Sequence, residues 1–289
     1  MEIRREYWYN GNGHKTGNIC GGRILKYDVT VSIVNYNDYD RARKAIASIL
    51  EYTHGVRVKI YLVDNASKDG SAVRLADEFP TIGVIFSDKN LGFGAGHNLV
   101  LPLIDSDFHA IVNPDIILDG DILTELADFL RKNPDIGMCT PQIHYMDGQP
   151  QHLPKRNPKL KYLIANRAPL KRFEQHRQHY KMLDEDLSGV TDVEFASGCF
   201  LFVRTPLLKL VGGFDERYFM YLEDADLTRT LRKNTRVVYY PYAYVYHDYA
   251  RASAHSLKYF MIHVLSMFKY FWKWHGYDET KQEAEIEVK

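Results

Sequence analysis

The chain has 289 residues, and its 37 lysine and arginine residues balance 37 aspartate and glutamate residues. A chain of this length can bury a large core, and without net charge it has no overall field that attracts nucleic acid. Its three cysteines, Cys20, Cys139 and Cys199, form no CxxC pair, which disfavours a zinc cluster and indicates a reducing compartment. No apolar segment suits a signal peptide or reaches the roughly 18 residues of a membrane span, so we expect a cytoplasmic protein.

Residues 1–27 contain many glycine, asparagine and charged residues without clear periodicity, and we interpret them as a loosely structured leader with at most one short strand. From residue 28 onward, strand and helix patterns alternate. Strands are expected at 29–36, 58–65, 82–86 and 108–113, and helices at 41–52, 71–79, from residue 95, and at 121–132. Such alternation predicts right-handed βαβ units and a mainly parallel sheet flanked by helices.

Further strands are expected at 138–146, 193–204 and 236–241, with a helix that ends at residue 233. Between them, residues 152–182 form a basic insert. Its basic residues, opposed only by Glu174, are Lys155, Arg156, Lys159, Lys161, Arg167, Lys171, Arg172, Arg177 and Lys181. The insert is either a solvated surface segment or a platform for an anionic acceptor.

Residues 257–289 are expected to form an amphipathic helix followed by a polar tail. One helix face has the spacing i, i+3, i+4, i+7 and contains Leu257, Phe260, Met261, Val264, Leu265, Phe268, Phe271 and Trp272. The other face carries Lys258, Tyr259, His263, Lys269, Tyr270, Lys273 and Trp274. Such a helix either lies in the plane of a membrane interface or packs its apolar face on the sheet.

Two carboxylates directly follow expected strands, Asp64 after KIYLV and Asp115 after AIVNP. Both should lie at the carboxyl edge of the sheet, where open α/β sheets bind ligands. Asp64 could accept hydrogen bonds from a nucleobase or ribose, although in DNASKDGS it is equally explained as a turn residue. Asp115 could bind Mg²⁺ or Mn²⁺ through its hard oxygens.

The loop NLGFGAGHN (90–98) is rich in glycine but is not a dinucleotide fingerprint. His97 stands where the third glycine of that fingerprint belongs, and the loop follows the third strand of the alternating region, not the first. Hydride transfer with NAD is therefore disfavoured. The glycines instead permit a tight loop or a close approach of the backbone to a ligand.

Together these segments resemble family 2 glycosyltransferases of the GT-A fold, and more closely the rhamnosyltransferase-like branch. The matching segments, in family order, are VSIVNYN, VDNASKDGS, NLGFGAGHN, NPD, FASGCFLFVR, GGFDERYFMYLEDADLTRTLRK and VYHDYARAS. The resemblance implies an α/β fold with a Rossmann-like GT-A domain over residues 28–256, and it leaves the leader and the basic insert unmatched.

The resemblance also implies roles for individual residues. Contacts to the nucleotide sugar fall to Tyr36, Asp64, Asn65, Lys89, Asn90, Gly92, Asn113, Asp115 and Arg251. Among them Asp64 reads the base, Arg251 reaches the diphosphate, and Asp115 takes the metal-binding place of the DxD motif, with Asn113 where many members have the first Asp. His247 completes the shell of Mn²⁺ or Mg²⁺, and Asp224 matches the catalytic base.

His247 and Asp224 can also be explained without a role in catalysis or metal binding. Glu223, Asp224 and Asp226 all lie where a helix is expected to begin, and negative charge is favoured there by about 0.3–1 kcal/mol. His247 is equally explained as a histidine whose hydrogen bonds are satisfied in the core. These readings assign no chemistry to either residue.

The resemblance implies an inverting transfer from a nucleotide-diphosphate sugar, most specifically dTDP-L-rhamnose. The acceptor would be a hydroxyl of a polyprenyl-diphosphate-linked saccharide, used for bacterial O-antigen, capsule or cell wall at the inner face of the plasma membrane. Inversion needs a base beside that hydroxyl, opposite the leaving group, and no covalent enzyme intermediate. A UDP-hexose donor, peripheral membrane contact and a homodimer are left open.

Two other classes of function are weighed against this one. A sugar-nucleotide nucleotidyltransferase would be expected to have a basic, glycine-rich phosphate loop near its first strand, and VSIVNYN contains none. A non-catalytic nucleotide-sugar-binding protein is disfavoured because Asp64, Asp115, Asp224 and His247 are all present.

Overall fold

The computed structural model describes residues 7–8, 27–167, 170–248 and 257–277. The strands are β1 (Tyr7–Trp8), β2 (Tyr27–Asn35), β3 (Val58–Asp64), β4 (Gly83–Phe86), β5 (Ser106–Val112), β6 (Ile116–Ile117), β7 (Ile136–His144), β8 (Pro150–Gln151), β9 (Thr191–Asp192), β10 (Phe200–Arg204) and β11 (Arg236–His247). The α-helices are α1 (Tyr39–Tyr52), α2 (Ser71–Glu78), α3 (Gly94–Asn98), α4 (Ile122–Lys132), α5 (Leu160–Arg167), α6 (Glu174–Tyr180), α7 (Thr205–Val211), α8 (Glu223–Leu231) and α9 (Leu257–Lys273).

The sheet has a parallel half and a mixed half. Its strand order is β1-β4-β3-β2-β5-β10-β7-β11-β6, and every pair from β1 to β5 is parallel. This half is the predicted βαβ region, and its strands start and end within about two residues of the expected positions. In the other half β10 runs antiparallel to both β5 and β7, while β11 is parallel to β7. The α/β prediction is confirmed, with parallel pairing concentrated in the first half.

Two sequence predictions for the mixed half are wrong in detail, and one helix was missed. The segment 193–204 forms a strand only at β10, and α7, which was not expected, follows it directly. β11 does not end at Pro241 but continues to His247, because its register on β7 shifts between Tyr240 and Tyr244. A proline lacks the backbone donor for a regular ladder, and this irregularity lets the strand pass through it.

Helices cover both faces of the sheet. On one face, α1, α2 and α4 pack on the strands around Ile33, Leu62 and Val112. On the other, the α3 region, α7 and α8 enclose Val63, Ile111 and Leu201. Neighbours such as Leu62 and Val63 are both buried but on opposite faces of the sheet. Successive side chains of a strand point to opposite faces, and helices cover both of them.

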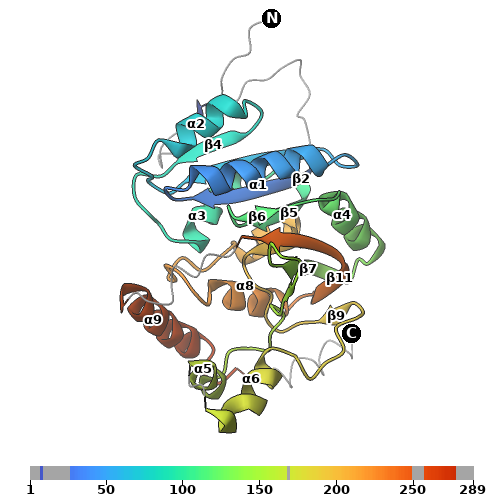
Figure 1. Ribbon diagram of the computed structural model, residues 1–289, viewed down its shortest axis with the longest axis vertical. Coiled ribbons are helices and arrows are strands. Elements are labelled where there is room, and N and C mark those ends of the chain that lie inside the picture. The colour runs from blue at the N-terminus through green and yellow to red at the C-terminus, as the bar shows by residue number, and fades with distance from the viewer. Residues whose placement is uncertain (1–6, 9–26, 168–169, 249–256, 278–289) are drawn as a thin grey trace, which may run out of the picture.

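The basic insert and α9 lie at the end of the molecule opposite α1 and α2 (Figure 1). Here α5 and α6 pack with the start of α8 and the end of α9 in a third apolar cluster that includes Tyr162, Tyr180 and Tyr270. Arg156 of the insert pairs with Asp184 and Glu185, just beyond the predicted basic segment. Part of its positive charge is therefore balanced locally.

The buried face of α9 is not the predicted apolar face. Ser266, Tyr270 and Trp274 are buried, and the indole N–H of Trp274 donates to Asp226 of α8 at 2.8 Å. Lys273 pairs with the same carboxylate at 2.6 Å. The expectation that the apolar face packs on the sheet is therefore wrong, because specific polar and aromatic contacts to α8 fix the opposite face. No helix of the described residues is long and apolar enough to cross a membrane.

Candidate active site

Asp64 and Asn65 lie where β3 ends, at the carboxyl edge of the parallel half. Asp64 is 6% exposed, and its Oδ1 accepts a hydrogen bond from the Ser67 backbone N–H at 3.2 Å. This is the local turn contact that the bland reading requires, so the base-reading role of Asp64 stays a prediction. The Asn65 side chain reaches away from the turn, accepts from the Leu91 N–H at 2.8 Å and donates to the Gly92 carbonyl at 2.9 Å.

The glycine loop is therefore clamped to the end of β3. Its Gly92 has φ +84°, and a Cβ atom there would lie 1.9 Å from the Phe219 carbonyl oxygen. The next residue, Phe93, donates its N–H to that same oxygen at 3.0 Å. Glycine at position 92 thus permits both the left-handed backbone and the contact with the segment that leads into α8.

Asp115 and His247 meet at the junction of β6 and β11. His247 Nε2 lies 3.3 Å from Asp115 Oδ1, and the Asp248 N–H donates to the Asp115 carbonyl at 2.8 Å. Gln151 of β8 fixes the imidazole from its other side, because its Oε1 is 3.1 Å from His247 Nδ1. When Nδ1 carries the proton for that bond, Nε2 presents a lone pair toward Asp115.

This pair fits a divalent cation. Asp115 Oδ1 is buried and has no hydrogen-bond partner, which is costly unless the charge is compensated. Two adjacent ligands of an octahedral ion with bonds of about 2.1 Å lie about 3 Å apart, close to the observed separation. Gln151 is the outer partner that metal-binding histidines commonly have. The described residues contain no group of three His, Cys, Asp or Glu side chains that could hold a metal.

The three acids at the start of α8 occupy different environments. Glu223 is buried, and its pKa is raised well above the usual value by burial and by the charge of Asp224. Asp226 is buried and holds Lys273 and Trp274 of α9. Asp224 is partly exposed, and its Oδ2 accepts a hydrogen bond from the Gly198 N–H at 2.9 Å. Burial also raises the pKa of Asp224, while the N–H of Gly198 and the charge of Lys155 oppose that shift.

Gly198 and Cys199 connect the two parts of the site. The Cys199 carbonyl accepts from the Asn113 N–H at 2.9 Å, so the NPD turn is bound to the residue that follows Gly198. Asp115 and Asp224 both act electrostatically on the Cys199 thiol, whose pKa burial raises to about 12. The geometry thus brings the predicted metal-binding and base residues around one short backbone segment.

The other residues predicted to contact the donor are Tyr36, Lys89 and Arg251. Tyr36 is 51% exposed beyond β2, and Lys89 is exposed next to Asn90 of the glycine loop. Arg251 lies outside the described residues. Gln151 and Gly198 were missed by sequence reasoning. Gln151 lies 96 residues from His247 and belongs to no recognised motif. Gly198 belongs to FASGC, a segment that matches the family, but the match does not indicate which residue it contacts.

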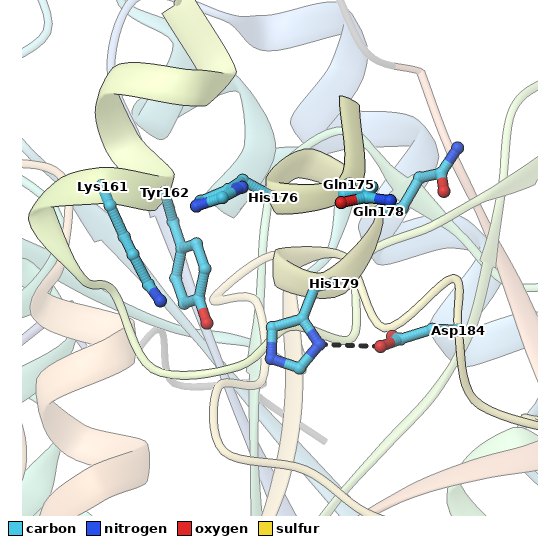
Figure 2. A pocket seen from close by; sticks show the side chains of 7 residues that line it. All are labelled: Lys161, Tyr162, Gln175, His176, Gln178, His179 and Asp184. Atoms are coloured by element: carbon cyan, nitrogen blue, oxygen red, sulfur yellow. Dashed lines mark hydrogen bonds and ion pairs between the residues drawn. The ribbon is translucent and has the colours of Figure 1, made fainter. Parts of the chain in front are cut away.

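A separate cavity of about 400 Å³ opens between α5 and α6 (Figure 2). It is lined by Lys161, Tyr162, Gln175, His176, Gln178, His179 and Asp184. Figure 2 shows the imidazole of His179 joined to Asp184, at 2.7 Å. The cavity belongs to the basic insert and contains none of the predicted catalytic or metal-binding residues.

Sequence comparison identifies the class of enzyme to which this site belongs. A family model described as "Glycosyltransferase like family 2" matches residues 27–260, which is most of the chain. The chain belongs to this family and is a glycosyltransferase.

Two curated relatives are similar in sequence. N-acetylglucosaminyl-diphospho-decaprenol L-rhamnosyltransferase of Mycobacterium tuberculosis is 29% identical over 238 residues, covering 77% of this chain and 76% of the relative. Rhamnosyltransferase WbbL of Escherichia coli is 28% identical over 191 residues, covering 62% of this chain and 69% of the relative.

Solved glycosyltransferases share the fold. S. aureus TarS 1-349 in complex with UDP superposes with a TM-score of 0.55 and 18% sequence identity. The superposition covers 76% of this chain and 60% of the TarS chain. GalNAc-T7 with UDP, GalNAc and Mn²⁺ superposes with a TM-score of 0.61 and 14% sequence identity. The superposition covers 78% of this chain and 44% of the GalNAc-T7 chain. The predicted GT-A fold is thereby confirmed.

We predict that Gly92→Ala destabilises the protein more than Gly70→Ala. Both glycines have positive φ, but a Cβ at Gly70 meets nothing within 4 Å. Gly70→Ala should lower the free energy of unfolding by about 1–2 kcal/mol through the backbone alone. Gly92→Ala should add about 1–3 kcal/mol, because Phe219 must move. Chemical denaturation measures both values, and equal losses would contradict the close contact at Gly92.

Proposed function

We propose that this glycosyltransferase inverts the donor's anomeric carbon and transfers L-rhamnose from dTDP-L-rhamnose to a saccharide linked to a polyprenyl diphosphate. The observation that carries the proposal is the convergence of Asp224, Asp115 and His247 around Gly198 and Cys199. The names of the two curated relatives supply the sugar, and that of the mycobacterial relative supplies the lipid-linked acceptor. The product would serve bacterial cell-surface polysaccharide synthesis.

Asp224 is assigned as the general base. Its carboxylate takes the proton of the acceptor hydroxyl while that oxygen bonds to C1 of the sugar. The bond from C1 to the diphosphate oxygen breaks, and its electron pair leaves with the nucleoside diphosphate. The bonds from Gly198 and Ala225 to the two carboxylate oxygens orient the group for this attack.

Asp115 and His247 are assigned to hold Mn²⁺ or Mg²⁺ together with donor oxygens. Such an ion supplies positive charge where the leaving diphosphate gains negative charge. Asp64, Asn65 and the glycine loop form the nucleoside side of the same edge. Asn113, which stands where a second carboxylate would add affinity, contributes its backbone N–H to Cys199.

The basic insert is assigned to the acceptor side. Lys155 and Tyr180 both act electrostatically on Asp224, so the insert borders the proposed base. A UDP-hexose donor remains the second candidate, and it is favoured by the UDP-bound structures that share the fold.

The exposed face of α9 is assigned to peripheral contact with the inner face of the plasma membrane. Leu257, Phe268 and Trp272 are 76%, 71% and 75% exposed, and Met261 and Leu265 complete the same stripe. The helix contains no acidic residue, and Lys258 and Lys269 flank the stripe. This combination suits an interfacial helix on anionic lipid. In a two-fold homodimer built on this face, like charges would meet, so charge favours lipid over a second copy.

The direct test is transfer by the purified protein between defined substrates. With dTDP-L-rhamnose and a synthetic N-acetylglucosaminyl-diphospho-lipid, we expect mass spectrometry to detect one added deoxyhexose, with loss of the reaction after chelation by EDTA and its return with Mn²⁺. UDP-glucose, UDP-galactose, UDP-N-acetylglucosamine and GDP-mannose serve as alternative donors. Transfer from one of these donors alone would replace rhamnose in the proposal, and transfer from none of them would overturn it.

We predict that Asp224→Asn lowers the rate of transfer by about 10²–10⁴ and leaves folding and donor binding intact. The amide keeps an oxygen for the Gly198 N–H but cannot take up the acceptor's proton. Glu223→Gln is the matched control, because Glu223 is the neighbouring acid on α8 but is buried, and burial and the charge of Asp224 raise its pKa well above the usual value. A fully active Asp224→Asn enzyme, or an equal loss in Glu223→Gln, would refute the assignment.

We predict that the double variant Leu265→Ser and Phe268→Ser binds vesicles of phosphatidylglycerol about 30-fold more weakly. Removing two exposed apolar side chains from the interface costs about 2 kcal/mol or more. Leu210→Ser removes an equally exposed side chain on α7 and should leave vesicle binding unchanged. Co-sedimentation measures binding, and analytical ultracentrifugation tests the alternative. If the wild type binds no vesicles but forms dimers, and the double variant does not form them, the stripe is a contact with a second copy of the chain.

A further inference from the structure

Lys155 begins the basic insert in sequence but is fixed against the wall of the active site. Its backbone N–H donates to the Phe195 carbonyl at 3.1 Å, and its carbonyl accepts from the Phe195 N–H at 2.9 Å. This isolated bridge holds the insert beside the segment that leads to Gly198. The Lys155 Nζ lies 4.7 Å from the centroid of the Phe195 ring, so the side chain is held by its backbone and by a cation–π contact.

The direction of this side chain matters because Gly198, three residues after Phe195, binds Asp224. The ammonium of Lys155 and the carboxylate of Asp224 act on each other electrostatically, but no direct ion pair joins them in the described part of the chain. Burial lowers the pKa of Lys155, and the charge of Asp224 opposes that shift. The bridge and the cation–π contact therefore hold Lys155 beside the segment whose Gly198 binds the proposed base.

Three other titratable groups near Asp224 have pKa values that burial raises. Burial raises the pKa of Tyr180 above its usual range and that of Cys199 to about 12, so both are protonated. Burial and the charge of Asp224 itself raise the pKa of Glu223 well above its usual value. Apart from the backbone N–H groups of Gly198 and Ala225, Lys155 is the favourable partner of the ionised carboxylate.

We propose that Lys155 is a positioning residue for the transfer: its ammonium keeps the Asp224 carboxylate ionised and thereby sets the lower pH limit of the reaction. The inference rests on the proposed role of Asp224 as base. A carboxylate in a site closed by an acceptor loses water, and without a nearby cation it would take a proton from solvent before it could take one from the acceptor. Lys155 thus gives the basic insert a specific part in the chemistry.

The first test needs no substrate. In protein with ¹³C-labelled aspartate carboxyls, the Asp224 resonance is identified by its absence in Asp224→Asn, and its titration midpoint is measured by NMR. Loss of a nearby opposite charge shifts a carboxyl midpoint upward by about 1–3 pH units, and we expect a shift of at least about one unit in Lys155→Gln. Lys155→Arg should keep the midpoint near that of the wild type.

Lys159→Gln is the matched control, because Lys159 lies in the same insert and is exposed. It removes one positive charge without facing Asp224 and should not move the midpoint. An unchanged midpoint in Lys155→Gln, or an equal shift in Lys159→Gln, would overturn the proposal. Circular dichroism of each variant establishes that it is folded, and Lys155→Met, which retains the aliphatic stem, replaces Lys155→Gln if that variant unfolds.

The second test uses the pH profile of transfer with the donor and acceptor that the wild type accepts. The acidic limb of kcat/KM should move upward by the same amount as the NMR midpoint, with a tenfold loss of rate per unit below it and recovery above it. A rate that falls equally at every pH would show a structural role and refute the inference. If the Asp224 midpoint shifts in Lys155→Gln but the wild type transfers sugar from no donor, the electrostatic contact is supported and only the proposed function is refuted.

Discussion

The proposed active site depends on the backbone of Gly198 and Cys199. One residue donates its N–H to Asp224, and the other accepts from Asn113 in the turn that carries Asp115. Both lie just before β10, which runs antiparallel between β5 and β7 and so starts at the edge where β5 ends. A Cβ at Gly198 would lie 3.1 Å from the Phe93 ring and 3.2 Å from the Asp224 Cβ. The absence of a side chain there lets the glycine loop, the turn that carries Asp115 and α8 meet.

The same constraint separates three acids that look alike in the sequence. Glu223, Asp224 and Asp226 lie within one helical turn, yet their surroundings differ. Glu223 is buried with a raised pKa, Asp224 accepts from Gly198, and Asp226 is bound to Lys273 and Trp274. The helix-terminus effect of about 0.3–1 kcal/mol applies to all of them and cannot distinguish them. Tertiary contacts decide their chemistry, and only Asp224 is both partly exposed and oriented by hydrogen bonds toward the site.

The predictable features were those that depend on nearby residues. Alternating apolar strands and helices gave the parallel half of the sheet, and its strand ends correctly placed Asp64 at the edge. Proline rules failed at Pro241, because a register shift accommodates it, and the helical pattern of α9 gave two faces without saying which is buried. Asp224 and His247 were assigned through resemblance, since neither follows a diagnostic local pattern. The partners Gln151 and Lys155 lie far from them in sequence, and no spacing rule relates such residues.

The contacts of α9 connect its exposed apolar stripe to the backbone that leads to Asp224. Ser266 of α9 donates to the Met220 carbonyl, and the adjacent Phe219 carbonyl accepts from Phe93 of the glycine loop. Between Met220 and the helix that carries Asp224, Tyr221 and Leu222 hold left-handed φ values of 73° and 69°. Non-glycine residues adopt this region only when surrounding contacts enforce it, at about 1–3 kcal/mol each. Docking of α9 on α8 supplies such contacts, so the helix with the exposed apolar stripe also supports the backbone that delivers Asp224.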